Sequence, residues 1–130
     1  MATYLFSVPL INGKTKAWKN YIKEIKDNRY EDYKRSRQNA GIRTEQATLQ
    51  HTPGGDMIVV RIEADDINKV FGRFFQSNEP FDVWFKEKVL METHGMDPNG
   101  EIPRIEPVSL EFQVSERTET RAYAETRKNR

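Results

Sequence analysis

Cysteine is absent from this chain of 130 residues, and so are the segments that direct a protein to a membrane. Without cysteine there can be no disulfide, no thiolate nucleophile and no cysteine-bound zinc. No apolar run approaches the roughly twenty residues that a membrane-spanning helix needs. The first eleven residues lack the basic lead and the apolar core of a secretory signal. We therefore expect a cytoplasmic protein that does not enter a membrane.

A net charge of one sign is also lacking, because 21 basic residues stand against 20 acidic ones. A charge so balanced gives no long-range attraction to nucleic acid or to anionic lipid. RNA-recognition modules stack bases on aromatic residues of their central strands, and the apolar segment MIVVRIEA at residues 57–64 contains none. Nucleic acid and membrane are therefore not expected as partners.

The length of the chain suits one domain with one modest core. We assign residues 1–114 to this domain, because the composition changes sharply after them. The segment SERTETRAYAETRKNR, residues 115–130, offers apolar contact only at the AYA near its middle. This charged C-terminal tail is either solvated or an arm that becomes ordered on a partner subunit.

Four stretches of the domain have the apolar density or the alternation of β-strands. The first is apolar on both faces and is expected at the centre of a sheet, whereas the last alternates cleanly and should bury one face. The second and third flank the turn TPGGD at residues 52–56, which predicts an antiparallel hairpin. The four predicted strands are Thr3–Ile11, Ile42–His51, Met57–Ala64 and Val108–Val114.

Two helical regions separate these strands. The first is predicted from about Lys14 to Ala40, with Asn12 as its cap. The second begins after an aspartate pair at residues 65–66 and restarts at Pro80 after a short break. The element order is βαββαβ, which predicts a ferredoxin-like α+β fold, with a four-stranded antiparallel sheet and helices on one face.

Several motifs in this arrangement are similar to those of a known group of proteins. They are TP-x-GD at residues 52–56, PFD-x-WF at residues 80–85, HGMD at residues 94–97, and Arg29, Tyr33, Ser36 and Arg37 on the first helix. On these residues the chain resembles the dimeric α+β barrel superfamily, and more narrowly an uncharacterised bacterial family within it. The resemblance implies a homodimer in which two ferredoxin-like protomers pack sheet against sheet.

The resemblance leaves the function open, because the superfamily includes cofactor-free monooxygenases, isomerases, haem enzymes and plain ligand-binding domains. No cofactor is expected. Haem would need an axial histidine, for which His51 and His94 are the only candidates, and known haem members are mostly larger than this chain. No metal is expected either, because the histidines do not have the HExxH or His-x-His spacing of a metal site.

The inward stripe of the first predicted helix turns from apolar to polar along its length. Its members in order are Trp18, Ile22, Ile25, Arg29, Tyr33, Ser36 and Ala40. A core-facing arginine needs an acceptor, and we expect Glu45 to pair with Arg29, or else Glu63 or Asp82. Such a pair either ties the helix to the sheet or forms a site. In a site, Arg29 would hold a carboxylate or enolate oxygen while Tyr33 orients the ligand.

The helix that follows Pro80 is apolar almost all round, which predicts that it is covered on two sides. Trp84 within it is either a core and subunit contact or part of the aromatic wall of a pocket. Asp82 lies in the first turn, where it either caps the helix or faces a ligand. His94 lies in the last turn, where it is either a C-terminal cap or a site residue.

These patterns lead to one expectation and one alternative. We expect a homodimeric domain that binds a small anionic or carbonyl-bearing molecule between its helices and its sheet, and whether it also catalyses a reaction is left open. The alternative is a non-catalytic structural or interaction homodimer, whose polar stripe is a buried network. The candidate ligand-binding residues are Arg29, Tyr33, Ser36, Glu45, Asp82, Trp84 and His94.

Overall fold

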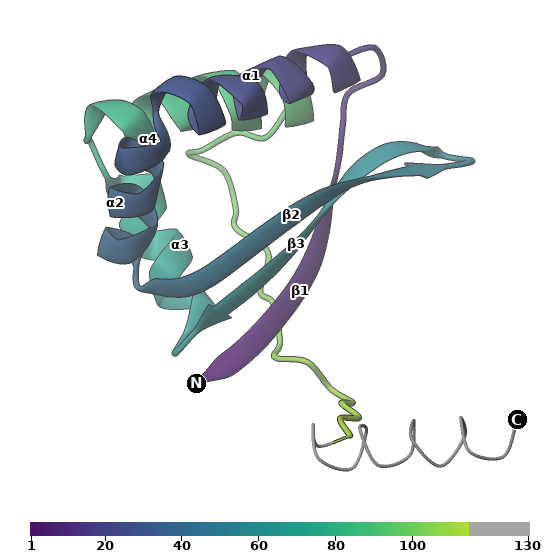
Figure 1. Ribbon diagram of the computed structural model, residues 1–130, viewed down its shortest axis with the longest axis vertical. Helices are drawn as coiled ribbons and strands as arrows, with labels where there is room; N and C mark the ends of the chain where they lie inside the picture. The colour runs from purple at the N-terminus through teal and green to yellow at the C-terminus, as the bar shows by residue number, and fades with distance from the viewer. Residues whose placement is uncertain (115–130) are drawn as a thin grey trace, which may run out of the picture.

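Three strands form one antiparallel sheet in residues 1–114, the part of the chain that the computed structural model describes. The strands are β1 (Ala2–Pro9), β2 (Ile42–Thr52) and β3 (Gly55–Ala64), in the order β1-β3-β2 (Figure 1). Both outer strands pair antiparallel with β3. The predicted mixed α+β class is confirmed, while the predicted charged tail at residues 115–130 lies outside the described residues.

The hairpin between β2 and β3 has the predicted position. Thr52 pairs with Gly55 across a two-residue turn, and the Thr52 hydroxyl donates a hydrogen bond of 2.6 Å to the Gly55 carbonyl. Gly55 adopts a φ of 127°, a backbone conformation that glycine alone adopts without strain. The glycine-rich turn therefore fixes the register of the two strands.

The prediction that the first strand lies at the centre of the sheet is wrong, because β3 occupies that place. β1 is an edge strand, and Leu5 on its helix-free side is 53% exposed. Ser7 lies two residues after Leu5 on β1 and so faces the same side of the sheet. Val59 of β3 pairs with Ser7 and therefore also faces that side. Apolar residues on both faces of a strand thus did not reveal which strand is central.

The predicted fourth strand, Val108–Val114, is also not formed. The segment meets the sheet at one point, where the Val108 N–H donates a hydrogen bond of 2.9 Å to the Thr3 carbonyl. Pro107, just before this point, has no N–H to donate and so cannot extend a ladder along β1. The segment is therefore attached to the edge of β1 by this one backbone hydrogen bond and does not pair with β1 as a strand.

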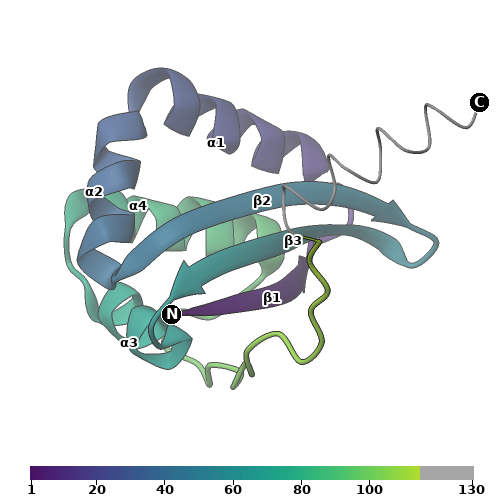
Figure 2. The same ribbon diagram turned by 60° about the horizontal axis from the view of Figure 1, so that its bottom comes forward.

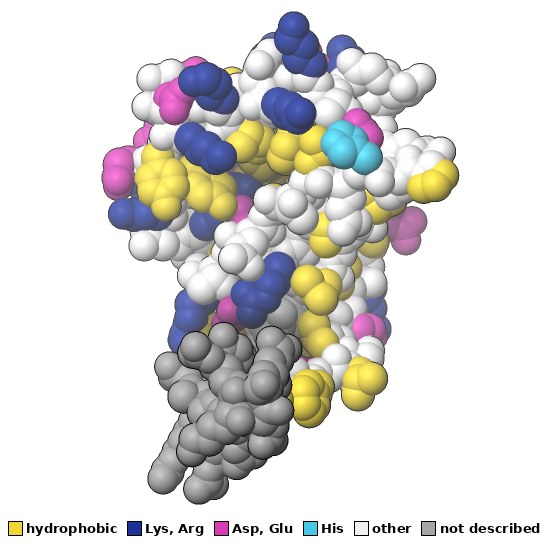
Figure 3. Space-filling view, turned by 45° about the vertical axis from the view of Figure 1, so that its right-hand side comes forward, with side chains coloured by type: hydrophobic (Ala, Val, Ile, Leu, Met, Phe, Trp, Pro, Cys, Tyr) yellow, Lys and Arg dark blue, Asp and Glu magenta, His cyan; other side chains and the backbone are white. Residues whose placement is uncertain are grey.

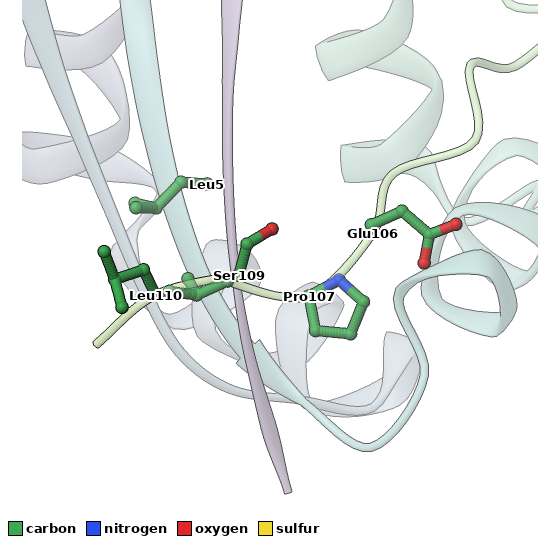
Figure 4. A pocket seen from close by; sticks show the side chains of 6 residues that line it. Leu5, Glu106, Pro107, Ser109 and Leu110 are labelled. Atoms are coloured by element: carbon green, nitrogen blue, oxygen red, sulfur yellow. The ribbon is translucent and has the colours of Figure 1, made fainter.

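This segment passes around the edge of β1 from one side of the sheet to the other. Ile105 packs against the core under the helices, whereas Leu110 and Leu5 line a hollow of about 290 Å³ on the other side. Figure 4 shows the segment crossing β1, with Leu110 beside Leu5 and Glu106 on the opposite side of the strand. We call residues 105–114 the C-terminal arm.

The first helical region consists of two helices, α1 (Thr15–Asn28) and α2 (Tyr30–Ala40). The prediction of one helix is wrong, because the chain turns at Arg29, whose φ is −129° and ψ 18°. Asn28 has a low helix propensity, and the turn lets α2 descend toward β2 while α1 crosses above the sheet (Figure 1). The predicted Asn12 cap is also wrong, since α1 has Lys14 at its N-cap and no side-chain cap bond.

The second helical region begins and restarts as predicted. Asp66 caps α3 (Ile67–Gln76) by accepting a hydrogen bond of 2.9 Å from the Asn68 N–H. Pro80 is the first residue of α4 (Pro80–Phe85). The helix then continues as a π-helix, η1 (Lys86–Thr93), which the sequence pattern did not predict. None of the described helices combines the length and the hydropathy needed to cross a membrane.

All these helices lie on one side of the sheet (Figures 1 and 2). Beneath them the buried residues form two separate clusters, and the partly buried Val60 packs against both. The first cluster is Tyr4, Ala40, Ile62, Ala64, Ile67 and Val70. The second cluster is Leu10, Trp18, Ile58 and Val89. Val60 thus lies between the two clusters, and it pairs with Ala47 of β2.

Candidate functional site

Polar side chains meet where α2 approaches β2 and α4. At their centre is Arg37, whose side chain is 12% exposed, and its ion-pair partner Glu45, whose side chain is 14% exposed. We call the group the Arg37 cluster. Its members are Tyr33, Ser36, Arg37, Glu45, Ser77 and Asp82.

Glu45 forms the sheet side of the cluster, on β2. Its Oε1 atom accepts a hydrogen bond of 2.6 Å from the Tyr33 hydroxyl and one of 3.0 Å from the Arg37 Nε. Burial, together with the Glu45 carboxylate, raises the pKa of the Tyr33 hydroxyl far above its usual value. Tyr33 therefore remains a protonated donor throughout the physiological pH range.

Asp82 forms the other side of the cluster, at the start of α4, where it is buried. Its two oxygens accept hydrogen bonds from the hydroxyls of Ser36 and Ser77. Arg37 Nη1 donates a hydrogen bond of 3.2 Å to the Ser36 hydroxyl oxygen, which links the two carboxylates through one arginine. A buried carboxylate with such donors carries a much smaller desolvation cost than an isolated one.

Aromatic rings enclose the Arg37 guanidinium. Its Cζ lies 4.8 Å from the ring centroid of Tyr33, 5.2 Å from that of Phe74 and 4.5 Å from that of Phe85. A guanidinium stacked on ring faces is held by cation–π attraction as well as by its hydrogen bonds. The rings come from α2, α3 and α4, so that one arginine joins three helices to β2.

The expected partners of Arg29 are wrong, because its neighbours are Glu24 and Trp84. Arg29 Nε lies 3.4 Å from Glu24 Oε1, and its side chain is 35% exposed. Its Cζ lies 4.3 Å from the ring centroid of Trp84. The turn at Arg29 explains the difference: α2 takes a new direction there, and Arg37 rather than Arg29 reaches Glu45.

Trp84 continues the aromatic contacts from Arg29 toward the Arg37 cluster. Its ring centroid lies 5.7 Å from that of Phe81, which in turn lies 6.4 Å from that of Tyr33. On its other side, Trp84 meets Tyr21 of α1 edge to face at 5.9 Å. Within residues 1–114, α1 thus contacts Trp84 and α2 contacts its neighbour Phe81.

His94 is not part of the Arg37 cluster. It is the C-cap residue of η1, and its Nδ1 donates a hydrogen bond of 2.9 Å to the Pro9 carbonyl at the end of β1. Burial lowers the pKa of His94, while the bond to Pro9 opposes that effect. Its position favours the predicted role as a cap that fastens the helix to the sheet.

The other histidine, His51, belongs to a clip at the hairpin. Its Nδ1 lies 2.6 Å from Asp56 Oδ1, and the Thr15 hydroxyl donates a hydrogen bond of 2.5 Å to Asp56 Oδ2. The Thr15 hydroxyl and then His51 lower the pKa of the Asp56 carboxyl. These bonds fix the start of α1 to the hairpin and so set the height of α1 above β2.

The sequence reasoning missed three members of this region. Arg37 enters only through the resemblance, Ser77 falls in the predicted break before Pro80, and Lys86 is not singled out by the sequence. Lys86 is buried, and its Nζ donates hydrogen bonds of 3.1 Å to the Phe75 carbonyl and 2.7 Å to the Ser77 carbonyl.

The Arg37 cluster is satisfied internally. In residues 1–114, each buried side-chain nitrogen or oxygen has a hydrogen-bond partner. The same residues contain no group of three or more histidine and acidic side chains placed to hold a metal ion. The cluster is therefore suited to holding its elements in place, and its Tyr33 and Glu45 edge is the part that reaches the partly exposed surface.

The surface next to this edge is hollowed. Figure 3 shows the hollow beneath α1, with hydrophobic side chains in it and basic side chains, which are lysines on this helix, above it. Glu45, Ala47 and Leu49 of β2 face the helices, because they pair with Ile62, Val60 and Ile58 of the two core clusters. Ala47 is nevertheless exposed, which places it under the open space.

No family model matches this chain, and neither a curated protein nor a solved structure is significantly similar to it.

Proposed function

We propose that this chain is a ferredoxin-like protomer that binds a small anionic or carbonyl-bearing molecule in the hollow between α1, α2 and β2. The observation that supports this most is the exposure of Ala47 on the helix-facing side of β2. A core-facing position on a sheet is normally covered by a helix. Here the two core clusters leave it open, so apolar surface of the core side is accessible to a ligand.

The lining of the hollow supports an apolar body for the ligand. Leu49, two residues from Ala47 on β2, and Ile22 of α1 are partly buried against the second core cluster. At the other end, the Tyr33 hydroxyl and Glu45 provide polar atoms next to the apolar wall. An apolar pocket with a few polar groups at one end is the usual design of a small-molecule site.

The charges on α1 support an anionic group on the ligand. Lys16, Lys19 and Lys26 are exposed on this helix and belong to no salt bridge recorded in residues 1–114. The basic side chains above the hollow in Figure 3 raise the local concentration of anions. This attraction is weak at each lysine and depends on salt, so the apolar contacts supply most of the affinity.

In this proposal the predicted site residues have different roles. Tyr33 and Glu45 border the end of the hollow, while the lysines of α1 attract the anionic group of the ligand. Ser36 and Asp82 hold the wall that carries them, through Arg37. We assign no catalytic role to any residue, because the Arg37 cluster uses its donors and acceptors on its own members.

The test uses a probe that combines an anionic group with an apolar body, anilinonaphthalene sulfonate. Ala47→Trp fills the hollow and should weaken binding of the probe at least tenfold. Asn20→Trp adds the same ring on the outer side of α1 and should leave binding unchanged. Equal binding by both variants in a fluorescence titration would contradict the site, and mass spectrometry of co-purifying small molecules would identify a natural ligand.

A second proposal concerns assembly, and it is supported by the uncovered side of the sheet. We propose a homodimer in which the helix-free faces of two sheets pack together, as in a dimeric α+β barrel. Leu5, Met57 and Val59 lie on this face, and Leu5 is half exposed. An apolar surface of this kind is commonly an interface. Sedimentation at micromolar concentration should give the mass of two chains, and a monomer would contradict the proposal.

A further inference from the structure

We propose that the end of the C-terminal arm, residues 108–114, packs across the helix-free sheet face of a second copy of this chain, so that two protomers exchange arms. The inference rests on the homodimer proposed above and adds the element that closes it. It starts from the arm itself. Leu110 is 91% exposed and Phe112 is 87% exposed.

The pattern of the arm is that of a segment with one face to bury. Val108, Leu110, Phe112 and Val114 alternate with polar residues, and in an extended chain such residues share one side. The structure leaves this side in water beyond Val108. Removing two large apolar side chains from water is favourable, so a cover for them would stabilise the arm.

The direction of the arm takes it away from its own sheet. The Val108 bond to Thr3 anchors it at the edge of β1, and Leu110 lies beside Leu5 just past that edge. From there the arm leaves on the side of the sheet opposite to the helices (Figures 1 and 2). It thus ends where the sheet of a facing protomer would lie.

The helix-free face has the complementary chemistry. It offers the apolar side chains of Leu5, Met57 and Val59. Near Glu63 it also carries two arginines, Arg61 at 2.9 Å and Arg43, which adds to the positive potential at that carboxylate. Because Arg61 is paired with Glu63, Arg43 leaves one net positive charge beside this end of the face.

The arm has the opposite charge. Residues 108–114 include Glu111 and no basic residue. Apolar contact and charge therefore both match the arm to the face. Because one chain carries both surfaces, a two-fold arrangement buries two arms and two faces with the same set of contacts.

The cysteine-free chain allows a direct test by disulfide cross-linking. Phe112→Cys is introduced into ¹⁵N-labelled chains and Val59→Cys into unlabelled chains, and the two are mixed, equilibrated and oxidised. Arm exchange predicts a disulfide that joins a labelled peptide to an unlabelled one. The control pairs Phe112→Cys with Asn20→Cys on the outer side of α1, and it should cross-link at least tenfold more slowly.

Three outcomes would overturn the inference. A dimer in sedimentation with no cross-link above the control would contradict arm exchange but leave the sheet interface supported. A monomer would contradict both the arm exchange and the sheet interface. A disulfide formed within one chain, in a dilute sample of the Phe112→Cys, Val59→Cys double variant, would show that the arm covers its own sheet. As a second measurement, Leu110→Asp with Phe112→Asp should weaken dimerisation at least tenfold without changing the melting temperature of the monomer.

Discussion

Arg37 carries a charge that is largely withdrawn from water, and its surroundings show how the protein tolerates it. One carboxylate, one serine and the faces of three rings replace the water that the guanidinium loses. Because Glu45 is about as enclosed as Arg37, removing the arginine would leave a carboxylate without its cation. The cost of a broken buried pair comes mainly from the partner that remains.

The matched variants Arg37→Met and Arg29→Met measure this difference. Both keep much of the side-chain volume and remove one positive charge. Arg37→Met should lower the free energy of unfolding by about 3–5 kcal/mol, as breaking a buried pair does. Arg29→Met should lower it by no more than about 1 kcal/mol, because its pair with Glu24 is partly exposed. Urea unfolding curves give both values, and equal losses would contradict the assignment of Arg37 as the enclosed charge.

His94 should make stability depend on pH just below neutrality. Burial lowers its pKa from the ordinary value of 6.5, so the unfolded chain takes up the proton first as the pH falls. Stability should be complete above about pH 6.5, decrease as the pH falls through that value, and level off below the pKa of the folded state.

The variant His94→Gln tests this dependence, since glutamine keeps an N–H donor for the Pro9 carbonyl and does not titrate. The comparison is made in a His51→Gln background, which removes the only other histidine of the chain. Melting temperatures between pH 5.5 and 7.5 should decrease with falling pH for the background protein and stay flat for the double variant. A slope that survives in the double variant would assign it to other groups.

At the scale of elements, the parts that short-range chemistry determines are the parts that could be predicted. The glycine-rich turn fixes the hairpin, Asp66 caps α3 and Pro80 begins α4. The turn at Arg29 was not predictable from the apolar stripe, because the stripe continues through it with the same spacing. The π-helix was not predictable either, since it depends on how η1 fits against its neighbours.

Gly41 is an element boundary that can be tested with a matched glycine. It ends α2 with a φ of 93°, and an added Cβ would lie 2.7 Å from Arg73 Nη1. Gly41→Ala should therefore lower the free energy of unfolding by more than about 1 kcal/mol. Gly72→Ala, within α3 and with no heavy atom within 4 Å of the added carbon, should raise it by about 0.4–1 kcal/mol. Thermal unfolding measures both, and a loss at Gly72 would contradict the open surroundings of that helix position.

At the scale of the whole molecule, the sequence predicted a mixed fold with helices on one face. Of the seven candidate residues that it predicted, four lie together in the structure. Tyr33, Ser36, Glu45 and Asp82 meet in the Arg37 cluster, whereas His94 lies apart. The edge position of β1 and the missing fourth strand were not predictable, because apolar residues show that a surface needs cover without showing what covers it. We propose that a second copy of the chain covers the helix-free side of β1 and the apolar side of the arm.

The helix-free face gives the last prediction. Val59 lies at its centre, between Ser7 of β1 and Thr48 of β2. In Val59→Glu, a carboxylate would be buried against the apolar side chains of the second chain, and it would lose water without gaining a partner. The dissociation constant of the proposed dimer should rise by at least tenfold. The unfolding of the monomer should change little, since Val59 is only partly buried in one chain.

The control for this variant is Gln38→Glu, which adds the same charge at an exposed position of α2, on the helix side of the molecule. Sedimentation velocity at several micromolar concentrations compares the two variants with the unaltered chain. Gln38→Glu should remain dimeric where Val59→Glu is monomeric. If both variants stay dimeric, the helix-free face is not the interface, and the exposed apolar side chains of β1 and β3 require another cover.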